Sequence, residues 1–208
     1  VHYNLTATST QNTDNAVWTG DAGLVYLQKY NQNTTENSVL SFDVAPASAS
    51  TSPTSAQNAR ETLLPDSTHI AVKSPSNTPF VAMYTPRQTG AVIEIKDIST
   101  ITTLQRIQFD LRDILIDWPL NDTLLATTKP SANVPGYSYQ VSTQTSDRSR
   151  LLGPVPGLTV SMSPTGNNVI YSRSENNQLS LIHLNLETNE DFRLLTTLPE
   201  KCVWGSDG

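Results

Sequence analysis

The sequence has little cysteine, little lysine and no long apolar run. Its single cysteine, Cys202, excludes an internal disulfide and a zinc site built from several cysteines. The chain of 208 residues has 13 Lys+Arg, of which only five are lysines, against 19 Asp+Glu, for a formal net charge of −6. A nucleic-acid groove needs clustered positive charge to neutralise phosphates, so this balance predicts no nucleic-acid partner. Apolar runs are far shorter than the roughly 18 residues of a membrane-spanning helix, so we expect no membrane insertion by this segment.

Small hydroxyl residues are abundant instead. The chain has 27 Thr and 22 Ser, and such an excess of Thr over Lys and Glu favours strands over helices. Ser- and Thr-rich, Lys-poor chains are often found outside the cytoplasm. The chain opens on Val-His-Tyr-Asn, with no Met and no apolar leader, so we expect any signal peptide or membrane anchor to have been removed or to lie upstream.

Short alternating apolar segments bounded by turn residues recur along the chain, whereas amphipathic helices are hard to find. The predicted class is therefore all-β. The expected strands include residues 24–27, 80–84, 91–95, 169–171 and 179–184.

A repeat orders these strands. An apolar strand, a tight polar turn and a second apolar strand recur, with turns near Asp21, Ser76, Asn121, Thr165 and Asp207, spaced 55, 45, 44 and 42 residues apart. A rival register places the second turn at residues 65–67, but residues 80–84 then no longer supply the second strand. The low-complexity insertion at 45–58 explains the long first interval.

A repeat of roughly 40–50 residues with about four strands is typical of β-propeller blades. Residues 1–208 are thus interpreted as a partial β-propeller of about four to five four-stranded blades. Trp18, Trp118 and Trp204 occupy one repeat position and are expected to fill the wedges between blades. Because an open propeller exposes strand edges and apolar faces, we expect the isolated chain to self-associate.

Two kinds of motif resemble known proteins. The Trp-x-x-Asp-Gly/Ala turn followed by an apolar strand, and the run Ser-Pro-Thr-Gly-Asn-Asn-Val-Ile-Tyr-Ser at 163–172, resemble TolB-like and WD-repeat-like propellers. Residues 127–137 and 198–204 resemble uncharacterised bacterial propeller proteins. The resemblance implies an extracytoplasmic or cell-surface location and an amino-terminal anchor outside this segment, and it implies no established activity.

Motifs for chemistry are missing. The sequence has no Gly-x-Ser-x-Gly elbow, no His-Glu-x-x-His pair and no EF-hand loop, so we expect no catalytic residue, no metal site and no cofactor. His69 and His183 lie in strand-like runs and are interpreted as packed or edge residues. Cys202 is expected to be a buried, unreactive thiol in a strand that leads to Trp204.

An alternative interpretation is that the acidic and amide side chains of the turns form a ring that binds calcium. We interpret them instead as Asx turns, in which the side chain bonds its own backbone. The residues concerned are Asp21, Asn121, Asp122 and Asp207.

One loop is a candidate binding site. Residues 129–136 are expected to join two strands of the third blade at one face of the disc and to offer Lys129, Asn133 and Tyr137 to a partner. The alternative is that Pro130, Pro135 and Gly136 only fix a turn. The sequence therefore predicts a non-catalytic extracytoplasmic scaffold or binding module for an unidentified protein or glycan. The other possibility is an accessory or catalytic propeller domain of a hydrolase whose active site lies outside this segment.

Overall fold

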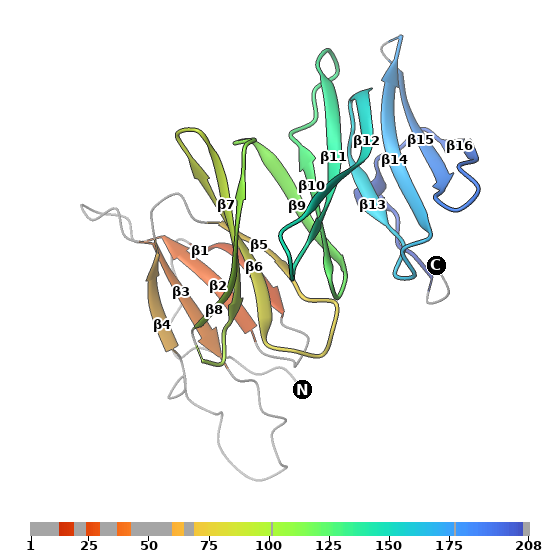
Figure 1. The fold of residues 1–208 in the computed structure, drawn as a ribbon. Helices are drawn as coiled ribbons and strands as arrows, with labels where there is room; N and C mark the ends of the chain where they lie inside the picture. The colour runs from red at the N-terminus through yellow and green to blue at the C-terminus, as the bar shows by residue number, and fades with distance from the viewer. Residues whose placement is uncertain are drawn as a thin grey trace, which may run out of the picture. The chain divides into compact units, whose positions relative to one another are not determined.

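The computed structural model (Figure 1) describes residues 74–100, 102–176 and 178–205 with their side chains, and before them the backbone of five strands between residues 13 and 73. These described residues contain sixteen strands, a single turn of 3₁₀-helix and no α-helix, which confirms the all-β prediction. The insertion at 45–58 and the turns at Asp21 and Asp207 lie outside the described residues.

The described strands form four antiparallel sheets, each of four strands paired in chain order. The first sheet has β1 (Thr13–Trp18), β2 (Leu24–Lys29), β3 (Asn37–Phe42) and β4 (Arg60–Leu64). The second has β5 (His69–Lys73), β6 (Phe80–Arg87), β7 (Gly90–Asp97) and β8 (Thr102–Phe109). The third has β9 (Ile114–Leu120), β10 (Thr123–Thr128), β11 (Pro135–Ser142) and β12 (Arg148–Pro156). The fourth has β13 (Val160–Met162), β14 (Asn168–Glu175), β15 (Gln178–Asn185) and β16 (Asp191–Leu195), followed by the 3₁₀ turn η2 (Pro199–Lys201).

Three of the repeat turns lie at equivalent places in these sheets. Ser76, Asn121 and Thr165 each fall between the first and the second strand of a sheet. Residues 65–67, the rival turn, fall between β4 and β5, which belong to different sheets. The chain divides into two compact units, residues 1–109 and 110–208, and each unit contains two of the four sheets.

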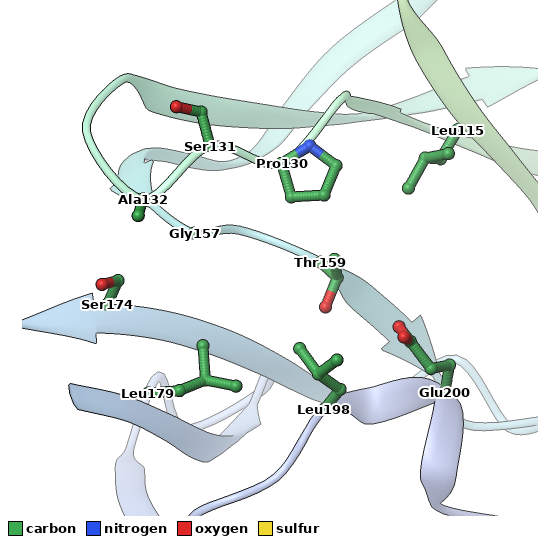
Figure 2. A pocket seen from close by; sticks show the side chains of 10 residues that line it. All are labelled: Leu115, Pro130, Ser131, Ala132, Gly157, Thr159, Ser174, Leu179, Leu198 and Glu200. Carbon is green, nitrogen blue, oxygen red and sulfur yellow. The ribbon is translucent and has the colours of Figure 1, made fainter. Parts of the chain in front are cut away.

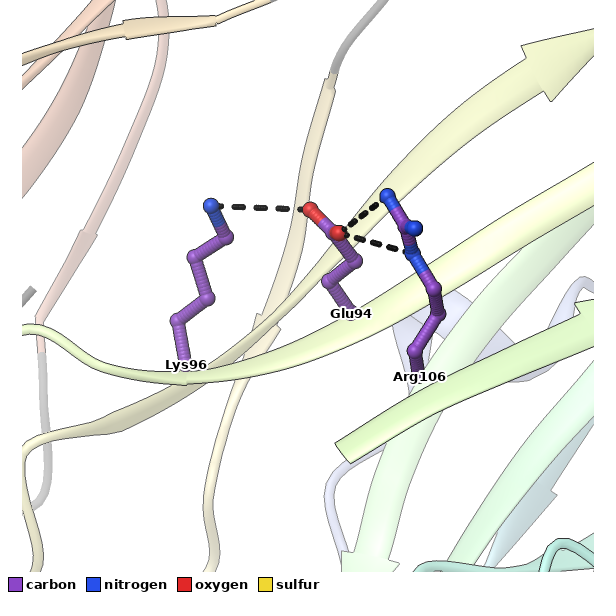
Figure 3. Close-up of polar contacts among 3 residues, drawn as sticks. All are labelled: Glu94, Lys96 and Arg106. Carbon is purple, nitrogen blue, oxygen red and sulfur yellow. Dashed lines mark hydrogen bonds and ion pairs between the residues drawn. The ribbon is translucent and has the colours of Figure 1, made fainter. Parts of the chain in front are cut away.

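In the first unit, a cross-strand ion cluster lies on the second sheet (Figure 3). Glu94 on β7 is the register partner of Arg106 on β8. Its Oε1 accepts a hydrogen bond from Arg106 Nε at 3.0 Å and lies 2.9 Å from Arg106 Nη2. Lys96 Nζ lies 3.5 Å from Glu94 Oε2. Opposite charges at directly paired positions favour one strand register, so this cluster has a structural role in the sheet.

In the second unit, apolar residues join the third and fourth sheets. Tyr171, Ile182 and Leu184 pack around Leu158, which lies in the connection between these sheets. Leu125 of β10 packs with Met162 and Val169 of the fourth sheet. The inner strands β10 and β14 each bury four consecutive residues, so both of their faces are covered. Such double burial explains why these segments lack a strict apolar–polar alternation.

The chain after β16 differs from its prediction. Cys202 lies in no strand: it follows η2 as its C-cap, donates its backbone N–H to Pro199 O at 2.9 Å, and is half-buried rather than buried. Pro199 at the first helical position favours this turn because its fixed φ suits a helix and its missing N–H is not needed there.

The tryptophans also differ from one another. Trp118 is buried in β9, as a wedge residue would be. Trp204 is only half-buried, lies outside any strand, and donates its indole Nε1–H to Ser161 Oγ at 3.0 Å. Trp18 ends β1, and its side chain lies outside the described residues.

Candidate functional site

A pocket of about 410 Å³ opens in the second unit (Figure 2). Its volume lies within the roughly 300–1,000 Å³ that is usual for ligand sites. Its lining is mostly apolar, with three hydroxyl groups and one carboxylate. The lining residues are Leu115, Pro130, Ser131, Ala132, Gly157, Thr159, Ser174, Leu179, Leu198 and Glu200.

All of these residues come from one end of the two sheets. At this end β9 and β15 begin, with Leu115 and Leu179 as their second residues, and β14 finishes just after Ser174. The remaining lining residues lie in the connection from β10 to β11, in the connection from β12 to β13, and around η2. Antiparallel pairing brings alternate connections to the same end, so segments that are distant in sequence meet around one cavity. We call this end the pocket end, and the end formed by the other connections the turn end.

The connection between β10 and β11 is held in place by its backbone. Ser131 O accepts a hydrogen bond from Gly157 N at 2.7 Å, and Ser131 Oγ accepts one from Val134 N at 3.2 Å. At the start of this connection, Lys129 N donates to Asp113 O at 2.9 Å. In Figure 2 this loop forms the upper rim of the pocket, with Pro130 and Ala132 on the side that faces it.

The back wall depends on a glycine and a buried serine. Gly157 has a φ of +68°, and a Cβ placed there would lie 2.9 Å from Ser174 Cβ, so only glycine fits without strain. Ser172 is fully buried, donates its hydroxyl to Gly157 O at 2.6 Å, and accepts a hydrogen bond from Thr159 N at 2.9 Å. Thr159 Oγ1 shares a further hydrogen bond of 2.8 Å with Ser172 Oγ.

The lower rim has the only ionisable side chain among the residues that line the pocket. Glu200 follows the buried Pro199 in η2, and Figure 2 shows its carboxylate and the Leu198 side chain turned toward the cavity from that segment. Glu200 is exposed, and no described residue makes an ion pair or hydrogen bond with its carboxylate. The arrangement therefore offers an aliphatic cavity with one available negative charge at its mouth.

The residues predicted for binding lie beside this pocket. Lys129 and Asn133 are exposed, and Tyr137 is half-buried with its backbone N–H bonded to Thr128 Oγ1 at 2.9 Å. None of these three residues lines the pocket, although their loop supplies Pro130, Ser131 and Ala132. Polar type and loop position selected the three residues in the sequence, whereas the lining is mostly apolar. The run Leu198-Pro199-Glu200, which is part of a segment with family resemblance, was the available signal for the other rim.

One of the two strand histidines, His183, packs against an aromatic ring. His183 is half-buried on β15, and its ring centroid lies 4.6 Å from that of Phe192, its register partner on β16. His183 Nδ1 is buried and has no hydrogen-bond partner among the described residues. His69 lies in β5, and its side chain is outside the described residues.

The acidic turn residues do not gather in the part of the chain that is described. Asn121 and Asp122 are exposed between β9 and β10, and Asp122 Oδ1 accepts a hydrogen bond from Thr123 Oγ1 at 3.1 Å. No group of three or more His, Cys, Asp or Glu side chains that could hold a metal ion occurs among the described residues. Nor does any helix of this described part have the length and apolar character to cross a membrane.

Comparison with known proteins gives a fold. No protein-family model matches the sequence, and no curated protein matches it either. Among solved structures, TolB from Acinetobacter baumannii aligns with 92% of this chain at 14% identity and a TM-score of 0.57. The β-propeller domain of the Trilobed protease from Pyrococcus furiosus aligns with 88% at 8% identity and a TM-score of 0.62, and the acylaminoacyl peptidase of Pyrococcus horikoshii with 94% at 12% and 0.63.

The chain spans 45%, 56% and 34% of the length of these three proteins. Their shared feature is the β-propeller, and the four-stranded antiparallel sheets of this chain match it. The chain therefore has a TolB-like β-propeller fold. At sequence identities of 8–14%, these comparisons support the fold and no shared function.

Proposed function

We propose that this chain is a non-catalytic β-propeller module that binds a partner protein through the pocket end of its second unit. The observation that supports this proposal most directly is the cavity of about 410 Å³, which has a largely apolar lining and lies among the strand ends and connections at one end of two packed sheets. Strands hold such a site in a fixed shape, which lowers the entropy lost on binding. We further propose an extracytoplasmic location, for which the composition and the TolB-like fold are the support.

A protein segment suits the lining better than a glycan does. A sugar carries hydroxyl groups on most sides, and each one buried without a hydrogen-bond partner costs free energy. Of the three hydroxyl side chains in the lining, Thr159 already bonds Ser172, and Ser131 already accepts from the amides of its own loop. Apolar side chains of a peptide require no such partners.

A second candidate function is that of an accessory domain of a hydrolase. Its support is the likeness in fold to the propellers of the Trilobed protease and of acylaminoacyl peptidase. A Gly-x-Ser-x-Gly elbow in a domain that adjoins this segment in its full reading frame would favour this function over a free-standing binding module.

The test uses the chain of 208 residues and an array of random octapeptides, with a glycan array in parallel. We expect binding to a subset of peptides and its loss in Ala132→Trp, because an indole at this exposed rim position fills the cavity. Thr188→Trp, in an exposed turn at the turn end, is the matched control and should bind as the unmodified chain does. Binding of glycans alone, or equal peptide binding by Ala132→Trp, would overturn the proposal.

A further inference from the structure

The chemistry of the pocket has two parts. Three leucines, Leu115, Leu179 and Leu198, supply aliphatic surface, and Leu115 is 48% exposed. Glu200 supplies a carboxylate on the lower rim (Figure 2). An occupant that complements both parts has an aliphatic stem and a cationic end.

The carboxylate is available for such an occupant. Glu200 has no ion pair or hydrogen bond with another described residue, in contrast to Glu94 and Glu175, which lie 2.9 Å from Arg106 and Arg173 respectively. A cation that approaches Glu200 therefore does not have to displace an existing partner among these residues.

We propose that the pocket selects a lysine or arginine side chain of the partner protein. The methylene stem of that side chain packs against the leucines while its charged end pairs with the Glu200 carboxylate, as long cationic side chains commonly do at the border between apolar surface and water. This proposal rests on the proposed function. The net charge of −6 adds a general attraction for cations, so the test has to separate the local carboxylate from the overall field.

The experiment is a position-scanning octapeptide library in which one position is fixed as lysine, arginine, norleucine, citrulline or glutamate. Norleucine and citrulline keep most of the stem and remove the charge. We expect lysine and arginine peptides to bind about three- to tenfold more tightly than their neutral counterparts, the range for a partly exposed, charge-assisted contact. At about 1 M salt, where the Debye length is about 3 Å, this preference should shrink.

Two variants locate the effect. Glu200→Gln should remove the preference for lysine and arginine while leaving norleucine peptides bound as before. Glu187→Gln is the matched control, because it removes the same charge from an exposed site beyond the opposite end of β15, and the preference should persist in it.

The outcomes are separable. If no peptide of the library binds, the proposed function fails and this inference fails with it. If peptides bind and Ala132→Trp abolishes their binding, but charged and neutral residues bind equally, the proposed function stands and the inference is wrong. If Glu187→Gln and Glu200→Gln reduce the preference for lysine and arginine equally, the preference comes from the overall charge, and the inference is overturned.

Discussion

The two ends of the second unit are built differently. At the turn end, side chains are used to satisfy their own backbone: Ser142 Oγ accepts from Gln144 N and Thr145 N, and Asn185 Oδ1 accepts from Glu187 N and Thr188 N. At the pocket end, Ser131 and Thr159 are bonded locally as well, but aliphatic side chains line a cavity there, and the Glu200 carboxylate has no ion pair or hydrogen bond with a described residue. Polar side chains that already bond their own backbone are less available to a ligand, so this difference indicates that binding occurs at the pocket end.

The largest expected effect is at the buried support of the pocket end. Leu158 is fully buried between the two wall residues Gly157 and Thr159 and packs with Tyr171 and Ile182. Leu158→Ala should lower the free energy of unfolding by about 2–5 kcal/mol, because a cavity replaces the side chain. Urea unfolding followed by tryptophan fluorescence measures this loss.

The control for that substitution is Leu115→Ala. Its side chain is 48% exposed on the pocket rim, so the change in unfolding free energy should stay within about 0.5 kcal/mol. Equal losses at Leu158 and Leu115 would contradict the distinction between the support of the pocket and its lining.

The next effect concerns the buried hydroxyl of the back wall. Ser172→Ala leaves Gly157 O and Thr159 N without the partners that they have at 2.6 and 2.9 Å. Because unpaired buried polar groups are costly, we expect a loss of about 1–3 kcal/mol and faster hydrogen exchange at the Thr159 amide. Unchanged exchange at this amide would show that the wall does not depend on Ser172.

A smaller effect is expected at the turn end. Asn185→Ala removes the acceptor of two exposed hydrogen bonds, both 2.9 Å long, and should cost about 0.5–1.5 kcal/mol. Hydrogen exchange should rise at Glu187 and Thr188, while peptide binding at the pocket stays unchanged. Loss of peptide binding in this variant would mean that the two ends are coupled.

The smallest effect is a pH dependence from a carboxylate midway along β9. Burial raises the pKa of Asp117 above 3.8, although Trp118 N donates to its Oδ1. The folded state therefore holds the proton to a higher pH than the unfolded state does, and the stability that is fully present below pH 3.8 falls as the pH rises through the folded pKa.

Asp117→Asn should remove this fall, so that the variant gains stability relative to the unmodified chain as the pH rises above 3.8. Thermal unfolding at several pH values measures the gain. A gain that is larger at low pH would contradict the raised pKa of Asp117.

How far the sequence predicts the fold can be seen in individual segments. The expected strands at 80–84, 91–95 and 179–184 lie within β6, β7 and β15, because apolar patterning and turn residues act over a few positions. The same local reasoning was wrong about the strand at Cys202, where Pro199 starts a 3₁₀ turn. It also chose Lys129, Asn133 and Tyr137 by their polarity, whereas the part of this loop that lines the pocket is residues 130–132.

By itself, the sequence determined the all-β class and the positions of several strands, since both depend on neighbouring residues and their backbone preferences. Only the tertiary structure decided that Pro130, Gly157 and Glu200 surround one cavity. The cavity forms because certain strand ends share one edge of two packed sheets. The availability of Glu200 depends on the absence of a bonding partner for its carboxylate among the described residues. Both are properties of contacts between segments that are distant in the chain, and no local pattern encodes them.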